Sequence, residues 1–175
     1  MRPPKRNKAL DSDDRSDEQR IRTSAVALLA RREHSSLELA RKLARRGFDR
    51  DASARVIADL DESGLLSDDR FVDSFVTHRS GRGQGPVRIR AELRELGIEG
   101  ARVDQIFDSA RVDWAELAAI TRRRRFGAGP PRDFAERAKQ ARFLQYRGFT
   151  QEQIRAALDG ADDSVDAGLS TGGRR

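Results

Sequence analysis

Leu43-Ala44-Arg45-Arg46-Gly47-Phe48 is the first of three stretches in which a leucine stands four residues before a glycine and a bulky apolar residue follows that glycine. The other two are Leu93-Arg94-Glu95-Leu96-Gly97-Ile98 and Leu144-Gln145-Tyr146-Arg147-Gly148-Phe149. Each stretch predicts a Schellman helix ending, in which the glycine is left-handed and the next residue folds back onto the leucine. The glycines are 50 and then 51 residues apart, so the sequence predicts one helical unit repeated in tandem.

The composition favours small stacked modules over one large core. Of 175 residues, 37% are hydrophobic, 37% are charged and 6% are aromatic. Lysine and arginine number 35 against 29 aspartates and glutamates, a formal net charge of +6. Such a balance is usual near polyanions such as nucleic acids. Only four of the basic residues are lysines, however, so codon usage is an alternative reason for the arginine content.

The chain contains no cysteine, which excludes a disulfide framework and a thiolate zinc site and makes the cytoplasm the expected compartment. No apolar window is long enough for a membrane span, and no apolar run follows the basic first residues as in an export signal. Residues 1–16 and 160–175 are polar and lack periodicity, so both are expected to be disordered tails.

The first three-helix repeat is expected over residues 17–66. Its first helix covers about residues 17–33, and Ser35 with Glu38 forms a capping box for the second. The third helix runs into Gly64. The apolar positions expected to be buried in the second helix are Leu37, Ala40, Leu43 and Ala44.

Two further repeats are expected over residues 67–112 and 113–159. In the second, a flexible glycine-rich linker at 81–85 precedes a helix that begins at Pro86. In the third, Asp113 with Glu116 and Thr150 with Gln153 form capping boxes. The predicted fold is therefore all-α, an elongated array of three tandem helix-turn-helix-like units with nine helices and no strand.

No residue pattern indicates catalysis. His34 and His78 lie far apart and lack the spacing of a metal site or a proton relay, so capping or surface roles are favoured for both. The loop at 81–85 lacks the preceding strand and the Gly-Lys-Ser/Thr ending of a phosphate-binding loop. We therefore expect no catalytic residue, no metal and no cofactor.

The arginines carry more information about function. Several of them lie on one helix face at i, i+4 spacing, and others form an unbroken run. Like charges at this spacing destabilise a helix slightly unless an anionic partner compensates them. Arginine also binds phosphate or carboxylate with a planar, two-pronged group. The residues predicted to bind a protein or nucleic-acid partner are Arg41, Arg45, Arg79, Arg82, Arg88, Arg90, Arg94, Arg122, Arg123, Arg124, Arg125, Arg142 and Arg147. For any single one, stabilisation of a helix end or simple solvation is the alternative.

Three groups of residues, between about 22 and 159, resemble the RecX family of recombinase regulators. The first joins residues 28–35 (LLARREHS) to Arg46-Gly47-Phe48, and the last joins Arg142 to Arg155 through Arg147-Gly148-Phe149. The middle group, residues 64–71 (GLLSDDRF) and 85–93 (GPVRIRAEL), is the most specific because it contains many polar identities. Leu96 departs from the basic residue expected before Gly97.

The resemblance implies a non-enzymatic regulator that binds the RecA recombinase and its filament on single-stranded DNA. It implies inhibition of filament growth, ATP hydrolysis and strand exchange, hence a role in homologous recombination, DNA repair and the SOS response. The expected protein is a monomer without a membrane partner, and weaker, non-specific binding to single- or double-stranded DNA is expected. The rival hypothesis is a stand-alone DNA-binding protein that uses helix-turn-helix-like units.

Overall fold

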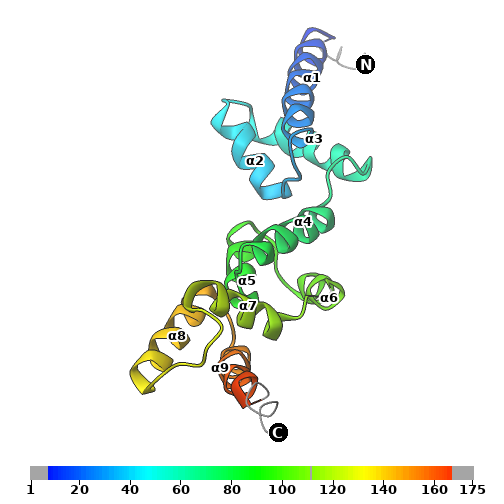
Figure 1. Cartoon of the computed structure of the whole chain (residues 1–175). Helices are drawn as coiled ribbons and strands as arrows, with labels where there is room; N and C mark the ends of the chain where they lie inside the picture. Colours follow the sequence, from blue (N-terminus) through cyan, green and yellow to red (C-terminus); the bar gives the residue numbers. More distant parts are fainter. Residues whose placement is uncertain (1–7, 111, 167–175) are drawn as a thin grey trace, which may run out of the picture. The chain divides into compact units, whose positions relative to one another are not determined.

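The computed structural model describes residues 8–110 and 112–166, and every regular element in these two ranges is a helix. Figure 1 follows the helices in chain order. They are α1 (Lys8–Leu29), α2 (Ser36–Arg45), α3 (Arg50–Glu62), α4 (Asp68–Gly81), α5 (Pro86–Glu95), α6 (Ala101–Ser109), α7 (Trp114–Phe126), α8 (Phe134–Arg147) and α9 (Gln151–Asp166). The all-helical fold and the three tandem three-helix repeats, α1–α3, α4–α6 and α7–α9, are confirmed.

The three glycines that define the repeat are left-handed, as predicted. Gly47, Gly97 and Gly148 have φ values of +83°, +78° and +89°. The amide of Phe48 donates to the Leu43 carbonyl at 3.3 Å, and the amide of Phe149 donates to the Leu144 carbonyl at 3.2 Å. These are the bonds that close a Schellman ending.

The predicted N-caps form, and the capping box of Thr150 with Gln153 is complete: the Thr150 amide donates to Gln153 Oε1 at 2.9 Å, and the Gln153 amide donates to Thr150 Oγ1 at 3.3 Å. For the other two boxes, the described residues show the N-cap bond alone. The amide of Glu38 donates to Ser35 Oγ at 3.0 Å, and the amide of Glu116 donates to Asp113 Oδ1 at 2.9 Å. Because the first turn of a helix has amides without intrahelical acceptors, these side chains fix where α2 and α7 begin.

Two helices extend beyond the boundaries expected from sequence. Helix α1 begins at Lys8 and α9 ends at Asp166, so residues 8–16 and 160–166 are helical where tails were expected. Extending an existing helix carries no nucleation cost, and neither Gly nor Pro interrupts the chain between Lys8 and Leu29. The remainder of the two expected tails lies outside the described residues.

The described residues divide into two units. Unit 1 contains the chain up to Val72 together with Leu96–Ile98, and unit 2 contains Asp73–Glu95 and the chain from Glu99 onward. In unit 1, helices α1, α2 and α3 bury a shared apolar core. Its buried members are Ile21, Ala25, Leu28, Leu39, Leu43, Ala52, Val56, Leu60 and Leu66.

The apolar face predicted for α2 was partly wrong. Leu39 and Leu43 are fully buried, whereas Leu37 is exposed and Ala44 is exposed. Leu39 and Leu43 are one helical turn apart, so they point to one side of α2 and leave Leu37 at its edge. Leu37 instead lies against Gly97, where a Cβ atom would come within 2.7 Å of its Cδ2 atom.

In unit 2, the third repeat has its own apolar core. Its buried members are Ala118 of α7, Leu144 of α8, Phe149 after the α8 ending, and Ile154, Ala157 and Leu158 of α9. Phe107 of α6 stacks on Trp114 of α7, with ring centroids 5.7 Å apart.

Candidate nucleic-acid interface

The end of α8 meets the start of α5 through backbone atoms. The amides of Gly85 and Val87 donate to the carbonyls of Arg147 and Gly148 at 2.9 and 3.0 Å. A Cβ atom on Gly85 would lie 2.4 Å from the Gly148 carbonyl, and one on Gly148 would lie 2.3 Å from Arg88 Cβ. A side chain at either position would clash, so this approach requires glycine at both. It holds the Schellman ending of α8 against the first turn of α5.

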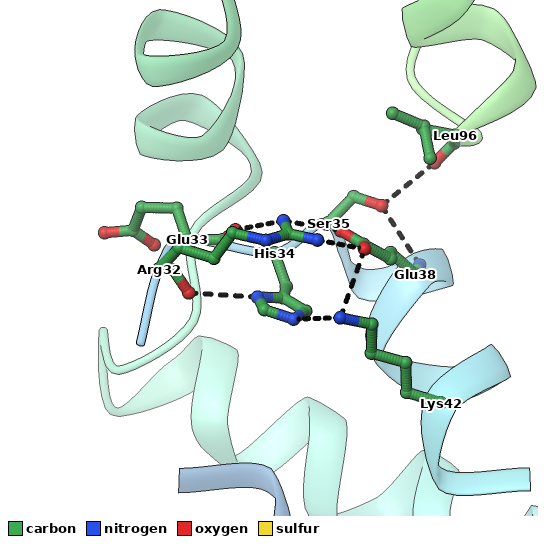
Figure 2. A network of polar contacts seen from close by, with 7 residues as sticks. All are labelled: Arg32, Glu33, His34, Ser35, Glu38, Lys42 and Leu96. Carbon is green, nitrogen blue, oxygen red and sulfur yellow. Dashed lines mark hydrogen bonds and ion pairs between the residues drawn. The ribbon is translucent and has the colours of Figure 1, made fainter. Parts of the chain in front are cut away.

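A related contact occurs in unit 1, one repeat earlier in the chain. Ser35, the N-cap of α2, donates to the carbonyl of Leu96 at 3.1 Å (Figure 2). Ser35 precedes α2 as Gly85 precedes α5, and Leu96 precedes Gly97 as Arg147 precedes Gly148. The period found in the sequence therefore corresponds to a recurring contact between one helix ending and the start of another helix.

The contact in unit 2 gathers four of the predicted arginines around one hollow. Arg147 Nη1 donates to the Arg82 carbonyl at 3.0 Å, which ties the α8 ending to the loop after α4. Gly83 of that loop lies against α7, since a Cβ atom there would be 2.7 Å from Thr121 Oγ1. The resulting hollow of about 190 Å³, the basic pocket, is lined by Arg82, Gly83, Thr121, Arg124, Arg125, Phe143 and Arg147.

The loop at residues 81–85 is therefore not the flexible linker expected from sequence. Gly83, Gln84 and Gly85 are buried, and the amides of Gly83 and Gln84 donate to the Ser80 and Arg79 carbonyls at 2.8 and 3.1 Å. Gly83 has a φ of +71°, so it ends α4 in the same left-handed manner as the repeat glycines end their helices.

The basic pocket has a concentrated positive charge. No carboxylate lines it, and none of Arg82, Arg124, Arg125 and Arg147 forms an ion pair within residues 8–110 and 112–166. Arg124 and Arg125 lie in the last turn of α7, where the helix dipole also favours cations. The arrangement can accept an anion between arginines from three segments of the chain.

Aromatic rings hold part of the pocket in place. The Arg147 guanidinium lies 5.3 Å from the centroid of the Phe143 ring, and Phe143 packs edge-on against Phe126, also at 5.3 Å. Arg125 in turn lies over Phe126 at 5.7 Å. Such cation–π contacts restrict the arginines while leaving their N–H groups able to donate to a ligand.

Five other predicted arginines pair with carboxylates of the same unit. Arg79 and Arg88 contact Glu92 at 2.9 and 3.0 Å, and Arg123 contacts Glu116 at 2.7 Å. Arg90 pairs with Asp104, and Arg94 lies 3.8 Å from Glu99. The hydrogen bond to Glu92 raises the pKa of Arg88 above its ordinary value. The compensating anion that sequence analysis sought for Arg90 and Arg94 is thus internal.

Arg122 does not belong to a surface site, and its inclusion was wrong. It is 1% exposed and donates to the side-chain oxygen of Gln140 at 3.1 Å. It also donates to the carbonyls of Gly129 and Ala128 at 3.0 and 3.1 Å, which fixes the loop after α7. Consecutive helical residues point about 100° apart, so the run from Arg122 to Arg125 could not lie on one face.

The remaining predicted arginines do not line the pocket. Arg41 and Arg45 are exposed on α2 in unit 1, and Arg142 is exposed on α8. Sequence reasoning missed Thr121 and Phe143 as pocket residues. The available signal for Phe143 was its position one turn before Arg147 on the same helix face.

His34 was expected to have a capping or surface role, but it is 1% exposed. Its Nδ1 atom donates to the Arg32 carbonyl at 2.9 Å, and its Nε2 atom accepts from Lys42 Nζ at 2.8 Å (Figure 2). Burial lowers the pKa of His34 below the ordinary 6.5, and the Arg32 and Lys42 cations act in the same direction. His34 is therefore a neutral structural group that joins the start of α2 to its middle.

Glu38 completes this cluster in unit 1. It pairs with Arg32 and lies 3.4 Å from Lys42 Nζ. Burial alone would raise the pKa of Glu38, but hydrogen bonds from Arg32 and the nearby cations lower it below 4.5. Among the described residues, no group of three or more acidic, histidine or cysteine side chains could hold a metal ion. None of the described helices is long and apolar enough to cross a membrane.

These features define a helical-repeat protein with three tandem three-helix domains and an arginine-lined pocket in unit 2. Comparison with known families gives matches to three domains of one family. The first three-helix domain of RecX matches residues 22–60, the second matches residues 67–105 and the third matches residues 112–158.

Known relatives extend the similarity over most of the chain. It is 50% identical over 148 residues to "Regulatory protein RecX" of Halorhodospira halophila, covering 85% of this chain and 92% of that protein. It is 44% identical over 142 residues to "Regulatory protein RecX" of Pseudomonas fluorescens, covering 81% and 92%. The chain therefore belongs to the RecX family, and its relatives' name supports a regulatory role.

Two solved structures have the same fold. The "Crystal structure of regulatory protein RecX" has a TM-score of 0.72 at 19% identity and covers 91% of this chain and 81% of that one. The "Crystal structure of RecX from Lactobacillus salivarius" has a TM-score of 0.67 at 20% identity, with coverages of 84% and 97%.

Proposed function

We propose that this protein is a non-enzymatic, cytoplasmic regulator that binds the RecA recombinase and its filament on DNA, and inhibits ATP hydrolysis and strand exchange. The observation that supports this most is the 50% identity to a protein named for regulation, over 92% of that protein's length. The basic pocket of unit 2 supports it further, because a RecA–DNA filament is a polyanion.

Inhibition needs no chemistry from this chain. A filament alternates between states that differ in structure and activity, and a ligand that binds one state more tightly shifts the population toward it. The size of the shift equals the difference in binding free energy between the two states, so a preference of about tenfold, or 1.4 kcal/mol, already reduces activity measurably.

The direct test is ATP hydrolysis by RecA on single-stranded DNA, titrated with this protein. We expect the rate to fall with increasing protein, both before and after filaments have assembled. A rate that stays constant through the titration in both orders of addition would rule out the proposed function.

A second candidate function, DNA binding without RecA, is favoured by the four pocket arginines that form no ion pair within the described parts of the chain. A helix-turn-helix-like binder of this kind should bind naked duplex with a steep salt dependence and a sequence preference. Equal affinity for duplexes of unrelated sequence, together with inhibition of RecA, would favour the regulator.

A further inference from the structure

We propose that the basic pocket formed by Arg82, Arg124, Arg125 and Arg147 binds consecutive backbone phosphates of a nucleic-acid strand. This inference rests on the proposed function in one respect: a DNA strand is available at the filament on which the regulator would act. It differs from the sequence-based expectation, in which arginines from all three repeats contributed alike.

The first argument is the distribution of carboxylates. Glu92, Asp104, Glu99 and Glu116 pair with five predicted arginines that lie outside the pocket, namely Arg79, Arg88, Arg90, Arg94 and Arg123. The pocket lining itself contains four arginines and no acidic residue. Among the residues that the structure describes, the charge of these five arginines is therefore compensated by neighbouring carboxylates, whereas that of the four pocket arginines is not.

The second argument is preorganisation. Arg147 is restrained by its bond to the Arg82 carbonyl and by the Phe143 ring, and the loop with Arg82 is fixed by the buried Gly83 and Gly85. Arg124 and Arg125 project from the end of a regular helix. A ligand that enters a site of this kind orders few additional side chains, so less binding energy is lost to conformational entropy.

The third argument decides between a nucleic acid and an acidic protein surface. One carboxylate has two oxygens and is satisfied by one arginine in a two-pronged pair. Four arginines around a hollow of about 190 Å³ suit a ligand that presents several anions in succession. A nucleic-acid strand does so. In a duplex, each strand carries one phosphate for about every 3.4 Å along the helix axis.

An exposed aromatic side chain lies next to the pocket in sequence. Tyr146 precedes Arg147 on α8 and is 78% exposed, and the guanidinium of Arg88 lies 5.7 Å from its ring centroid. Exposed aromatic rings beside basic grooves provide stacking surfaces for unpaired bases. This favours a single strand over a duplex.

The test is binding of fluorescein-labelled oligo-deoxythymidine, measured by fluorescence anisotropy over a range of salt concentrations. The pocket variant is Arg124→Gln with Arg125→Gln. The matched control is Arg123→Gln, because Arg123 lies on the same turn of α7 but pairs with Glu116 and does not line the pocket. Thermal unfolding by circular dichroism verifies that both variants fold.

We expect the pocket variant to bind the oligonucleotide at least about tenfold more weakly, with the slope of log K against log salt reduced by about 1.4, or 0.7 for each lost phosphate contact. The control should stay within about twofold of the parent protein. Arg82→Gln, a loop variant that leaves α7 intact, should weaken binding in the same direction. A pocket variant that keeps the parent affinity and slope would overturn the proposal.

Two further arms separate the alternatives. The pocket variant could lose binding to RecA, measured in the absence of DNA, and still bind the oligonucleotide. That result would show that the pocket binds an acidic protein surface and would also overturn the proposal. The pocket variant could lose oligonucleotide binding while the parent protein has no effect on ATP hydrolysis by RecA. That result would support phosphate binding in the pocket and contradict the proposed function instead. A matched duplex that binds more weakly than the single strand would support the role of Tyr146.

Discussion

At the scale of single residues, Gly47 and Gly148 end two helices in the same left-handed conformation but in different surroundings. A Cβ atom on Gly47 would meet nothing within 4 Å, whereas one on Gly148 would lie 2.3 Å from Arg88 Cβ. We predict that Gly47→Ala lowers the free energy of unfolding by about 1 kcal/mol, from backbone strain alone. Gly148→Ala should cost about 3 kcal/mol, because overpacking adds to the strain.

Chemical denaturation of the two variants measures this difference. Similar losses of stability for both would mean that the α8 ending does not meet α5 as described. The comparison is informative because the backbone strain is common to both positions and cancels between them.

His34 gives a pH prediction at the same scale. Burial lowers the pKa of His34 in the folded protein, so the unfolded chain binds this proton more readily. The free energy of unfolding should therefore decrease as the pH falls below 6.5, and the loss should end once the folded imidazole is protonated too. Arg32, Lys42 and Glu38 are the charged groups that surround the ring.

Unfolding measured between pH 4.5 and 6.5, the ordinary pKa values of glutamate and histidine, isolates this contribution from that of Glu38. His34→Gln removes the titrating group and should flatten the pH dependence in this window. An equally steep dependence in His34→Gln would assign the effect to another residue.

At the scale of elements, Ser35 and Asp113 both cap the start of a helix, but Ser35 also bonds to a distant backbone carbonyl. Ser35 accepts from the amide of Glu38 and also donates to the carbonyl of Leu96, while Asp113 only caps α7 among the interactions found for it. We predict that Asp113→Ala costs about 1 kcal/mol, as usual for a lost N-cap. Ser35→Ala should cost about 2 kcal/mol, because it also leaves the partly buried carbonyl of Leu96 without this donor.

Thermal unfolding of both variants would measure the difference. Ser35→Thr serves as the control for Ser35→Ala, since it retains a hydroxyl that can cap the helix. If Ser35→Ala and Asp113→Ala proved equally destabilising, the bond to Leu96 would contribute nothing to stability.

Most helices could be predicted from the sequence because their ends depend on local chemistry. Ser35, Asp113 and the glycines of the repeat act on neighbouring backbone groups, so their effect is readable within a few residues. The start of α1 and the end of α9 could not be read in this way, because the sequence at both places is polar and lacks the apolar periodicity that indicates a helix. Their extent depends on how far a formed helix continues.

The candidate site was less predictable because it depends on contacts between distant residues. Arg88 could have been paired with Glu92 from their i, i+4 spacing, but the contact of Arg90 with Asp104 spans fourteen residues. Helix geometry indicates that the four arginines from Arg122 to Arg125 cannot share one face, but it does not indicate which of them is buried. The approach of Gly85 to Gly148, which forms the pocket, has no local signal in the sequence.

At the scale of the whole molecule, the repeated unit provides a scaffold and the arginines differ in role according to their partners. Those that pair with Glu92, Asp104, Glu99 and Glu116 belong to the scaffold's own charge balance. Those around the basic pocket do not, and we expect them to affect binding rather than folding. If the protein acts as a regulator of the filament, we expect it to recognise the RecA-coated strand better than the bare strand.

The most direct test of that claim compares the affinity of the protein for RecA-coated single-stranded DNA with its affinity for the same strand without RecA. Both affinities would be measured at one salt concentration, because the phosphate contribution depends strongly on salt. We predict binding to the coated strand that is tighter by about tenfold or more, equivalent to at least about 1.4 kcal/mol. Equal or tighter binding to the bare strand would contradict the proposed regulator and favour a DNA-binding protein.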